Sequence, residues 1–305
     1  MTEVKNRKVE LFLDSGAYSA WSQGKKISID EYITFIKKHE DVIDVYANLD
    51  VITSAERTWR NQQHMEKAGL SPLPVYHFGE DIKWLTNLLE RKYPYIGLGG
   101  MVPISTQNLV HWLDDLFKNY LTDSTGIPIV KVHGFGLTSL RLMLRYPWYS
   151  VDSTSWVLTG RMGSIYIPKF RNGKWVYNED SWKVQVSNRS PQKDLKAKHL
   201  TTMSALEKKI FMQYITEKGY KFGKSEYRWV EDWKKYKRAD NEKWVESKVS
   251  KNTLKRELEI VIEPGVCNMY QLRDEMNILY FVDLEKSMPT WPWPFKTDEI
   301  QKGFM

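Results

Sequence analysis

Cysteine is almost absent from this chain of 305 residues, because Cys267 stands alone. A single cysteine excludes a disulfide framework within the chain and a zinc site built from several cysteines. Long apolar runs are also absent: none approaches the ~20 residues of a membrane span. The opening stretch MTEVKNRKVE lacks the apolar core of a signal peptide. We therefore expect a protein of the reducing cytoplasm that has no contact with a membrane.

Familiar cofactor motifs are missing as well. Glycine-containing turns occur at GLGGM (97–101) and HGFG (133–136), but neither has the spacing of a phosphate loop or of a dinucleotide-binding fold. We expect no cofactor. No HxH or HExxH pattern is present, so we also expect no metal, although His77, His133 and nearby aspartates leave a His/Asp site as an alternative.

Positive charge is concentrated in one block of the chain. The net charge is +7, but residues 161–256 hold 24 Lys and Arg against 11 Asp and Glu, a net of +13. Aromatic residues alternate with these cations, as in EYRWVEDWKKYKRADNEKW (226–244). Lys and Arg neutralise phosphates, and aromatic rings stack on unpaired bases. The plain alternative is a solvated helical surface with its rings packed inward. We expect nucleic-acid contacts at Arg161, Lys169, Arg171, Lys174, Trp175, Lys234, Lys235, Lys237 and Arg238.

The first half of the chain alternates apolar strands with amphipathic helices. Six strand–helix alternations in about 150 residues predict βα units and a parallel sheet. Polar or glycine residues follow each predicted strand: Asp14, Asp50, His77, Gly99 with Gly100, His133 with Gly134, and Asp152. In a (β/α)8 barrel these strand ends share the face that carries the active site. A doubly wound sheet is the alternative, but it gathers its ligand residues at one crevice.

The predicted fold is therefore α/β, an irregular (β/α)8 TIM barrel. We expect one domain over residues 1–305, with residues 161–256 as a nucleic-acid-binding insertion of short strands and basic helices. LEIVIEPG (258–265) is read as a late barrel strand, and residues 267–288 as a long closing helix. The tail PTWPWPF (289–295) is too rich in proline for a helix and is expected to pack as an extended arm.

Three aspartates, Asp14, Asp50 and Asp152, end predicted strands and are followed by small or polar residues. Carboxylates that converge on one rim shift one another's pKa values and can divide the tasks of nucleophile, general acid/base and ligand acceptor. The simpler interpretation is that each caps the helix that follows, since Asp is favoured at that position. Their shared place at strand ends favours the functional interpretation.

Short segments along the chain resemble the tRNA-guanine transglycosylase family, in the family's order and at similar intervals. The resemblance covers about residues 9–160 and 258–290. Its segments are DSGAY (14–18), YANLD (46–50), GLGG (97–100), VKVHGFG (130–136), YSVDSTSW (149–156) and MNILYFVDL (276–284).

The resemblance implies an enzyme that exchanges guanine in a nucleic acid for a free 7-deazaguanine base on an irregular (β/α)8 barrel. Asp152 would be the nucleophile at C1′, and Asp14 the general acid/base. Tyr18 would stack on the base, with His133 or Phe135 on the other side. The implied base-binding residues are Asp50, Ser15, Tyr18, His77, Gly99, Gly100, His133, Gly134 and Phe135.

The chain also departs from the family pattern. Ala17 replaces a glycine, Ser19 a glutamine, and His77 stands where a base-reading glutamine is expected. The zinc site of three cysteines and one histidine cannot form around Cys267 alone. These features are most similar to a zinc-free, phage-type branch that inserts bases such as 7-cyano-7-deazaguanine into DNA as protection against restriction.

The resemblance therefore implies DNA as the polymer, with the target guanine flipped out of a duplex or already single-stranded, in the cytoplasm of a phage host. Exchange in tRNA is the first alternative, because a basic surface serves either polymer. A nucleic-acid-binding barrel without catalysis and a glycosidase acting on sugars are further alternatives.

Overall fold

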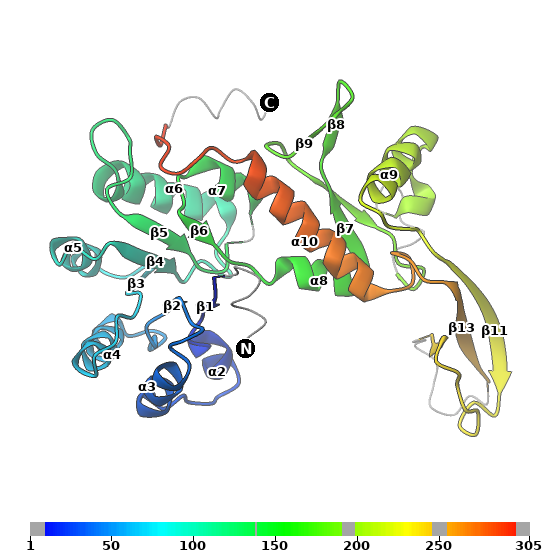
Figure 1. The fold of residues 1–305 in the computed structure, drawn as a ribbon, viewed down its shortest axis with the longest axis horizontal. Coiled ribbons are helices and arrows are strands. Elements are labelled where there is room, and N and C mark those ends of the chain that lie inside the picture. Colours follow the sequence, from blue (N-terminus) through cyan, green and yellow to red (C-terminus); the bar gives the residue numbers. More distant parts are fainter. Residues whose placement is uncertain (1–9, 138, 191–198, 246–254, 297–305) are drawn as a thin grey trace. The chain divides into compact units, whose positions relative to one another are not determined.

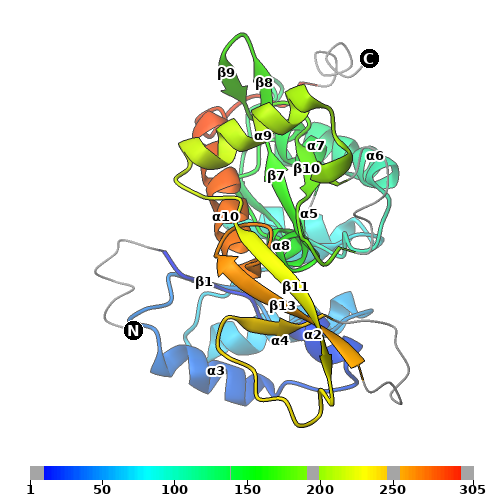
Figure 2. The same cartoon turned by 90° about the vertical axis from the view of Figure 1, so that its right-hand side faces the viewer.

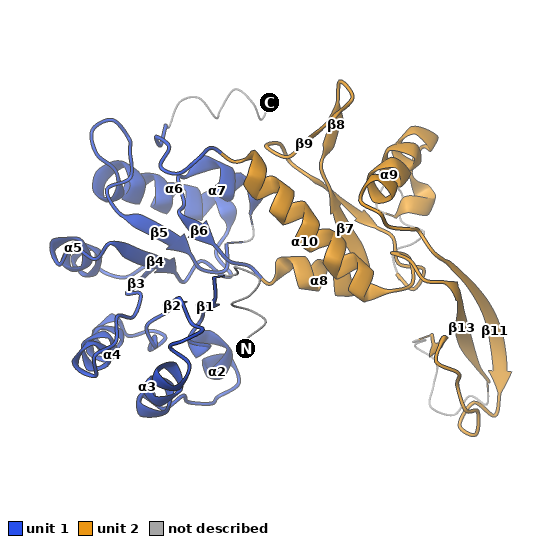
Figure 3. Cartoon of the chain, in the orientation of Figure 1, with its two compact units in different colours: residues 1–153, 289–305 blue, residues 154–288 orange. Residues whose placement is uncertain are grey.

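The computed structural model describes residues 10–137, 139–190, 199–245 and 255–296. The chain forms two compact units, residues 1–153 with 289–305 and residues 154–288 (Figure 3). The expected insertion, residues 161–256, lies wholly within the second unit. Organisation as one barrel domain with an insertion stays a prediction. Among the described helices, none is both long enough and apolar enough to cross a membrane.

Parallel strands form the centre of the first unit, and they follow one another in chain order (Figure 1). β1 pairs with β2, while β3, β4, β5 and β6 form a four-stranded parallel sheet. A parallel bridge between Ala47 and Leu73 joins the two groups. The strands are β1 (Phe12–Leu13), β2 (Val45–Tyr46), β3 (Val75–His77), β4 (Tyr95–Gly99), β5 (Lys131–Gly134) and β6 (Ser150–Val151).

The strands curve toward one another. The ring of Phe12 in β1 stacks on the ring of His133 in β5, with centroids 4.4 Å apart, although β2, β3 and β4 lie between these strands in the pairing order. Such a contact requires strong bending of the strand array. The expected α/β fold with a parallel sheet is confirmed for this unit, and closure of eight strands into a barrel stays a prediction.

Helices separate these strands along the chain and bury one face each. Ser28, Ser54 and Ser105 cap three of them by accepting a backbone N–H with the side-chain oxygen, which satisfies a donor left free at a helix start. The helices are α2 (Ala17–Ser22), α3 (Ile29–Lys38), α4 (Ala55–Lys67), α5 (Lys83–Glu90), α6 (Thr106–Leu116) with the π-helical turn η1 (Phe117–Leu121), and α7 (Leu140–Arg145).

The tail around 289–295 packs against the first unit without forming a helix, as predicted. The ring of Phe295 stacks on Tyr146 at 5.4 Å between centroids. The N–H of Phe295 donates to the carbonyl oxygen of Gly126 at 2.8 Å. A Cβ at Gly126 would lie 2.5 Å from the Phe295 carbonyl oxygen, so this close approach requires glycine.

The second unit combines antiparallel strands with two larger helices. β7 pairs with β10, β8 with β9, and β11 with β13 (Figure 2). In this last sheet β13 lies between β11 and β12. The elements are α8 (Ser155–Arg161), β7 (Ser164–Ile167), β8 (Lys169–Arg171), β9 (Lys174–Val176), β10 (Trp182–Gln185), the 3₁₀ turn η2 (Leu200–Thr202), α9 (Ala205–Glu217), β11 (Lys224–Glu231), β12 (Glu242–Trp244), β13 (Lys255–Glu263) and α10 (Tyr270–Ser287).

Helix α10 confirms the long helix expected over 267–288, and its role in closing a barrel stays a prediction. Its Asn277 is fully buried and donates to the carbonyl oxygen of Trp156 in α8 at 3.0 Å. The same amide accepts from the N–H of Tyr166 in β7 at 2.9 Å. One buried side chain thus joins α10 to the helix and strand that open this unit.

The prediction that 258–265 is a late barrel strand is wrong. β13 pairs antiparallel with both β11 and β12, so it belongs to a separate sheet. Its sequence alternates charged and apolar residues, KRELEIVIE, whereas barrel strands covered on both faces are nearly all apolar. The first part of the basic segment 226–244 forms strand β11, so the alternative of a solvated helical surface does not hold there.

Candidate functional site

The three predicted aspartates gather at one edge of the parallel strands. Asp14 follows β1 directly, Asp152 follows β6 directly, and Asp50 lies in the loop after β2. The negative charges of Asp152 and Asp50 both raise the pKa of Asp14, after the larger effect of its own partial burial. The carboxyl ends of the strands therefore bring together the residues that the sequence placed far apart.

Asp14 stands where the chain turns from β1 into α2. Gly16, at the start of α2, has a φ of 70°, a left-handed conformation that favours glycine. Its N–H bonds to the Asp14 carboxylate and opposes the rise in pKa, without cancelling it. Ser15 is buried and its Oγ accepts from the N–H of Ala17 at 3.4 Å. Asp14 is thus a carboxyl group that holds its proton more strongly than usual.

Asp152 has the opposite environment. Burial alone would raise its pKa, but His133 and the N–H of Gly136 outweigh burial and lower it. The Gly136 N–H donates to Asp152 Oδ1 at 2.7 Å, and His133 Nε2 lies 3.4 Å from the same oxygen. The side chain is 47% exposed. Asp152 is therefore an ionised carboxylate that a solute can reach.

His133 lies next to Asp152, and neither face of its ring is free to contact a ligand. Its side chain is only 3% exposed, because Phe12 stacks on it and Phe135 meets it edge-on at 4.4 Å. His133 Nδ1 bonds to Ser150 Oγ at 2.6 Å, and Ser150 bonds in turn to the Tyr95 hydroxyl. Stacking on the base was expected from His133 or from Phe135. The His133 ring is buried and cannot stack on a ligand, whereas Phe135 is partly exposed.

Asp50 is held by a histidine that a second carboxylate also contacts. His77 Nε2 lies 3.2 Å from Asp50 Oδ2, and His77 Nδ1 lies 3.3 Å from Glu80 Oε1. Burial opposes protonation of His77, but Asp50 and Glu80 outweigh it and raise its pKa to about 10. The other oxygen, Asp50 Oδ1, is buried and has no hydrogen-bond partner among the described residues. It is an unused acceptor at the site.

The predicted glycines mainly make room for neighbouring side chains. A Cβ at Gly99 would lie 2.7 Å from the His77 ring. A Cβ at Gly134 would lie 3.2 Å from the ring of Trp148. Gly100 has a φ of 69°, and its missing Cβ faces the backbone of Phe78. The structure therefore gives each glycine a packing or backbone reason, and backbone contacts with a ligand stay a prediction.

Two exposed aromatic rings lie on α2, directly after Asp14. Tyr18 and Trp21 are each 53% exposed, with ring centroids 5.9 Å apart. Sequence reasoning named Tyr18 but missed Trp21, as it missed Glu80 and Ser150. Two signals were available: Trp21 lies one helical turn beyond Tyr18, and Ser150 precedes Asp152 by two residues of an extended segment, which puts both side chains on one side. Glu80 follows a predicted strand end but had no such signal.

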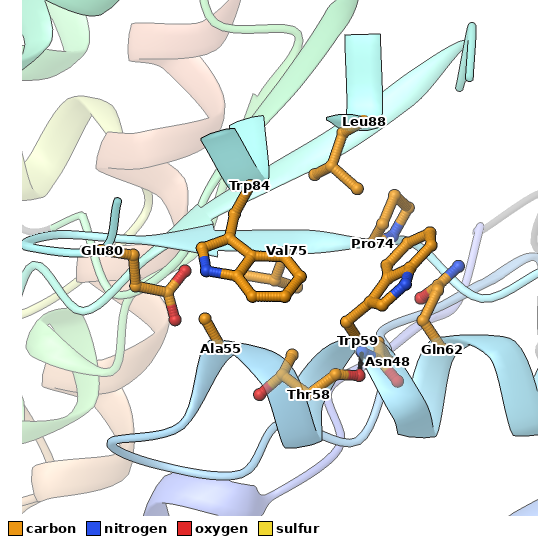
Figure 4. Close-up of a pocket in the computed structure, with 10 residues that line it drawn as sticks. All are labelled: Asn48, Ala55, Thr58, Trp59, Gln62, Pro74, Val75, Glu80, Trp84 and Leu88. Atoms are coloured by element: carbon orange, nitrogen blue, oxygen red, sulfur yellow. Dashed lines mark hydrogen bonds between the residues drawn. The ribbon is translucent and has the colours of Figure 1, made fainter. Parts of the chain in front are cut away.

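A small cavity lies between α4 and the segment from β3 to α5 (Figure 4). Its volume of about 20 Å³ holds about one water molecule and excludes a nucleobase. Asn48 Oδ1 and Gln62 Oε1, two amide oxygens of residues that line it, are buried without partners among the described residues. The lining residues are Asn48, Ala55, Thr58, Trp59, Gln62, Pro74, Val75, Glu80, Trp84 and Leu88.

Some residues of the second unit that were predicted to contact nucleic acid already bond to other side chains, whereas others are exposed. Arg171 pairs with Glu179 at 2.8 Å, and Trp175 donates through Nε1 to Glu217 while its ring packs on Tyr214. The remaining predicted residues split in the same way. Lys174, Lys234, Lys235 and Lys237 are exposed, Lys169 lies over the Trp182 ring, Arg161 interacts with Asp274, and Arg238 donates to the Glu242 carbonyl oxygen.

No group of three or more His, Cys, Asp and Glu side chains in the described ranges is arranged to hold a metal ion. Comparison with protein-family models, with curated proteins and with solved structures found no match. Function is therefore interpreted from the geometry of the site itself. That geometry offers one ionised carboxylate, one carboxyl group of raised pKa, and one buried acceptor fixed by a histidine.

Proposed function

We propose that this protein is a guanine transglycosylase that replaces guanine in DNA with a 7-deazaguanine base such as 7-cyano-7-deazaguanine. One observation carries the proposal: two carboxyl groups at the same strand edge have pKa values displaced in opposite directions, that of Asp152 downward and that of Asp14 upward. Environments that separate the pKa values of two acids assign them different roles in catalysis. The irregular eight-stranded barrel is part of this proposal.

The proposed reaction has two steps. The Asp152 carboxylate attacks C1′ of the target nucleoside, and the bond from C1′ to N9 of guanine breaks as Asp14 gives its proton to the departing base. A covalent ester between Asp152 and C1′ remains. Asp14, now a carboxylate, takes the N9 proton of the incoming 7-deazaguanine, whose N9 attacks C1′ and releases Asp152. A carboxylate meets the positive charge that develops at C1′, as in retaining glycosidases.

The same edge supplies groups that suit recognition of a purine-like base. Asp50 Oδ1 is a buried acceptor without a partner among the described residues, and N–H groups on a guanine edge are donors that would satisfy it. Tyr18, Trp21 and Phe135 provide exposed or partly exposed rings for stacking. The target guanine must leave the DNA stack to reach these groups, so a flipped or single-stranded guanine is the expected substrate.

Incorporation of a labelled base tests the proposal. The protein is incubated with radiolabelled 7-cyano-7-deazaguanine and either guanine-containing DNA or bulk tRNA, and label in the polymer is counted. We expect label in DNA and its loss in Asp152→Asn, while Asp115→Asn, an exposed aspartate on α6, stays active. Label in tRNA alone would mean that the protein exchanges bases in tRNA, the alternative substrate, and not in DNA. No label in either polymer, with folded protein, would contradict the proposal.

A further inference from the structure

The second compact unit carries the positive charge of the chain. Residues 154–288 contain 26 Lys and Arg against 18 Asp and Glu, a net charge of +8, whereas the rest of the chain has a net charge of −1. A charge of this size favours a polyanionic partner.

One face of the β11–β13–β12 sheet is already covered by its own side chains. Trp244 meets Trp233 and Tyr236 with ring centroids 5.9 and 5.8 Å away. The guanidinium of Arg256 lies over both tryptophans, 4.9 Å from the ring of Trp233 and 5.5 Å from that of Trp244. Register places Trp244 opposite Leu258, so these groups share a face. Their rings are engaged and cannot serve as an open platform.

The opposite face presents two exposed rings. Tyr227 pairs with Glu259 and Trp229 pairs with Glu257, and in an antiparallel pair such partners project to the same side. Tyr227 is 41% exposed and Trp229 is 60% exposed. Alternate residues of a strand lie about 6.8 Å apart on one face. That spacing lets two successive bases of an extended strand each lie on its own ring.

Cations outnumber carboxylates at the Tyr227 end of this face. Glu259 is fully buried and accepts from Arg189 Nε at 2.6 Å and from the Tyr227 hydroxyl at 3.3 Å. Lys243, also opposite Glu259, donates to the carbonyl oxygen of Asn268 at 3.1 Å. Burial lowers the pKa of Lys243, and the positive charges of Arg189 and Arg273 lower it further, while Glu259 opposes them without cancelling their effect. An anion placed here would be stabilised.

We propose that this face of the β11–β13–β12 sheet binds single-stranded nucleic acid, with bases stacked on Tyr227 and Trp229 and backbone phosphates at Lys243 and Arg189. The inference rests on the proposed function and deepens it, because it assigns the form of polymer presented to the enzyme. Flat rings stack on any base, so binding here is expected to depend little on sequence. Glu257 lies opposite Trp229 and directs the phosphates toward the Lys243 end of the face.

Fluorescence anisotropy with a labelled 12-nucleotide single strand and its duplex tests the inference. We expect the single strand to bind more tightly than the duplex. Trp229→Ala and Tyr227→Ala should each weaken single-strand binding by about 5- to 150-fold, the range of one lost base–ring stack. Trp229→Phe should restore most of the affinity, and Glu257→Gln should tighten binding at low salt.

The matched control is Phe35→Ala, which removes an exposed ring of α3 in the other unit and should leave affinity unchanged. Circular dichroism of each variant checks that it is folded. Unchanged affinity in folded Trp229→Ala, or preference for the duplex, would overturn the inference. Exchange activity separates the two proposals: single-strand binding that needs both rings, without any base exchange, contradicts the enzyme but supports this surface. Base exchange by a protein whose single-strand binding does not need the two rings supports the enzyme and contradicts this surface.

Discussion

Asp152 and Asp14 carry the same functional group in opposite surroundings. Asp152 lies beside His133 and accepts from the Gly136 N–H, whereas Asp14 is partly buried and faces two other carboxylates. The first arrangement favours the charged form and the second the neutral form. The sequence could predict that both lie at strand ends, and the resemblance implied separate roles for them. The opposite displacements of their pKa values could not be predicted, because His133 and Gly136 reach Asp152 only through the fold.

The pH dependence of base exchange follows from these directions. A lowered pKa keeps Asp152 ionised below the usual range of an aspartate, and a raised pKa keeps Asp14 protonated above it. We expect kcat/KM to fall on the acid side as Asp152 gains a proton and on the basic side as Asp14 loses one. Asp14→Asn should reduce kcat by about 10²- to 10⁴-fold and abolish the basic limb. An unchanged basic limb in that variant would remove Asp14 as the acid.

Glu80 acts with Asp50, whose effect is larger, to keep His77 protonated, so the effect of Glu80 on stability should depend on pH. The folded-state pKa of about 10 lies above the ordinary value of 6.5, so protonated His77 stabilises the fold fully below pH 6.5 and this contribution is lost as pH rises through 10. Glu80→Gln should lower the free energy of unfolding by about 1–3 kcal/mol at neutral pH. Urea titrations of both proteins should converge above pH 10, and a difference independent of pH would contradict this account.

Among the helices and strands, physical causes decide which elements could be predicted from the sequence and which could not. Strands β1 to β6 show apolar runs with polar stops, a local pattern that the sequence displays. β13 also contains an apolar run, but its partners β11 and β12 decide its direction, and pairing partners are not encoded locally. The aromatic–basic block was ambiguous for the same reason, since its alternation suits a strand while its charges suit an exposed helix.

Gly99 at the end of β4 tests how tightly the site elements fit. Alanine would place its Cβ 2.7 Å from the His77 ring, and the ring can move only by leaving Asp50 or Glu80. We expect Gly99→Ala to cost about 1–3 kcal/mol of stability and to weaken binding of the free base. Wild-type stability together with wild-type binding of the free base in Gly99→Ala would contradict the packing role of Gly99.

In the whole molecule, the net positive charge and the aspartate site belong to different compact units. The aspartate site lies in residues 1–153, and the net positive charge lies in residues 154–288. The sequence indicated this separation through its uneven charge. It could not indicate which rings of the basic unit remain exposed, because Trp233 and Trp244 become engaged only when the antiparallel sheet forms.

Salt dependence measures the contribution of the basic turn after β11. Lys234, Lys235 and Lys237 are exposed there. If each contacts a phosphate, changing all three to alanine should reduce the slope of log affinity against log salt by about 2, since each contact to a single strand contributes about 0.7. Titration of the single strand between 50 and 200 mM salt provides the slope. A slope equal to that of the wild type would exclude these lysines from the interface.

The central claim is a covalent bond between Asp152 and C1′ of a nucleoside in DNA. Its most direct measurement is the intact mass of the protein after incubation with a guanine-containing oligonucleotide, without incoming base, followed by denaturation. We expect a species heavier by the oligonucleotide minus guanine, with the modified peptide containing Asp152, and no such species for Asp152→Asn. A folded, DNA-binding protein that never gains this mass, or that gains it without Asp152, would contradict the account.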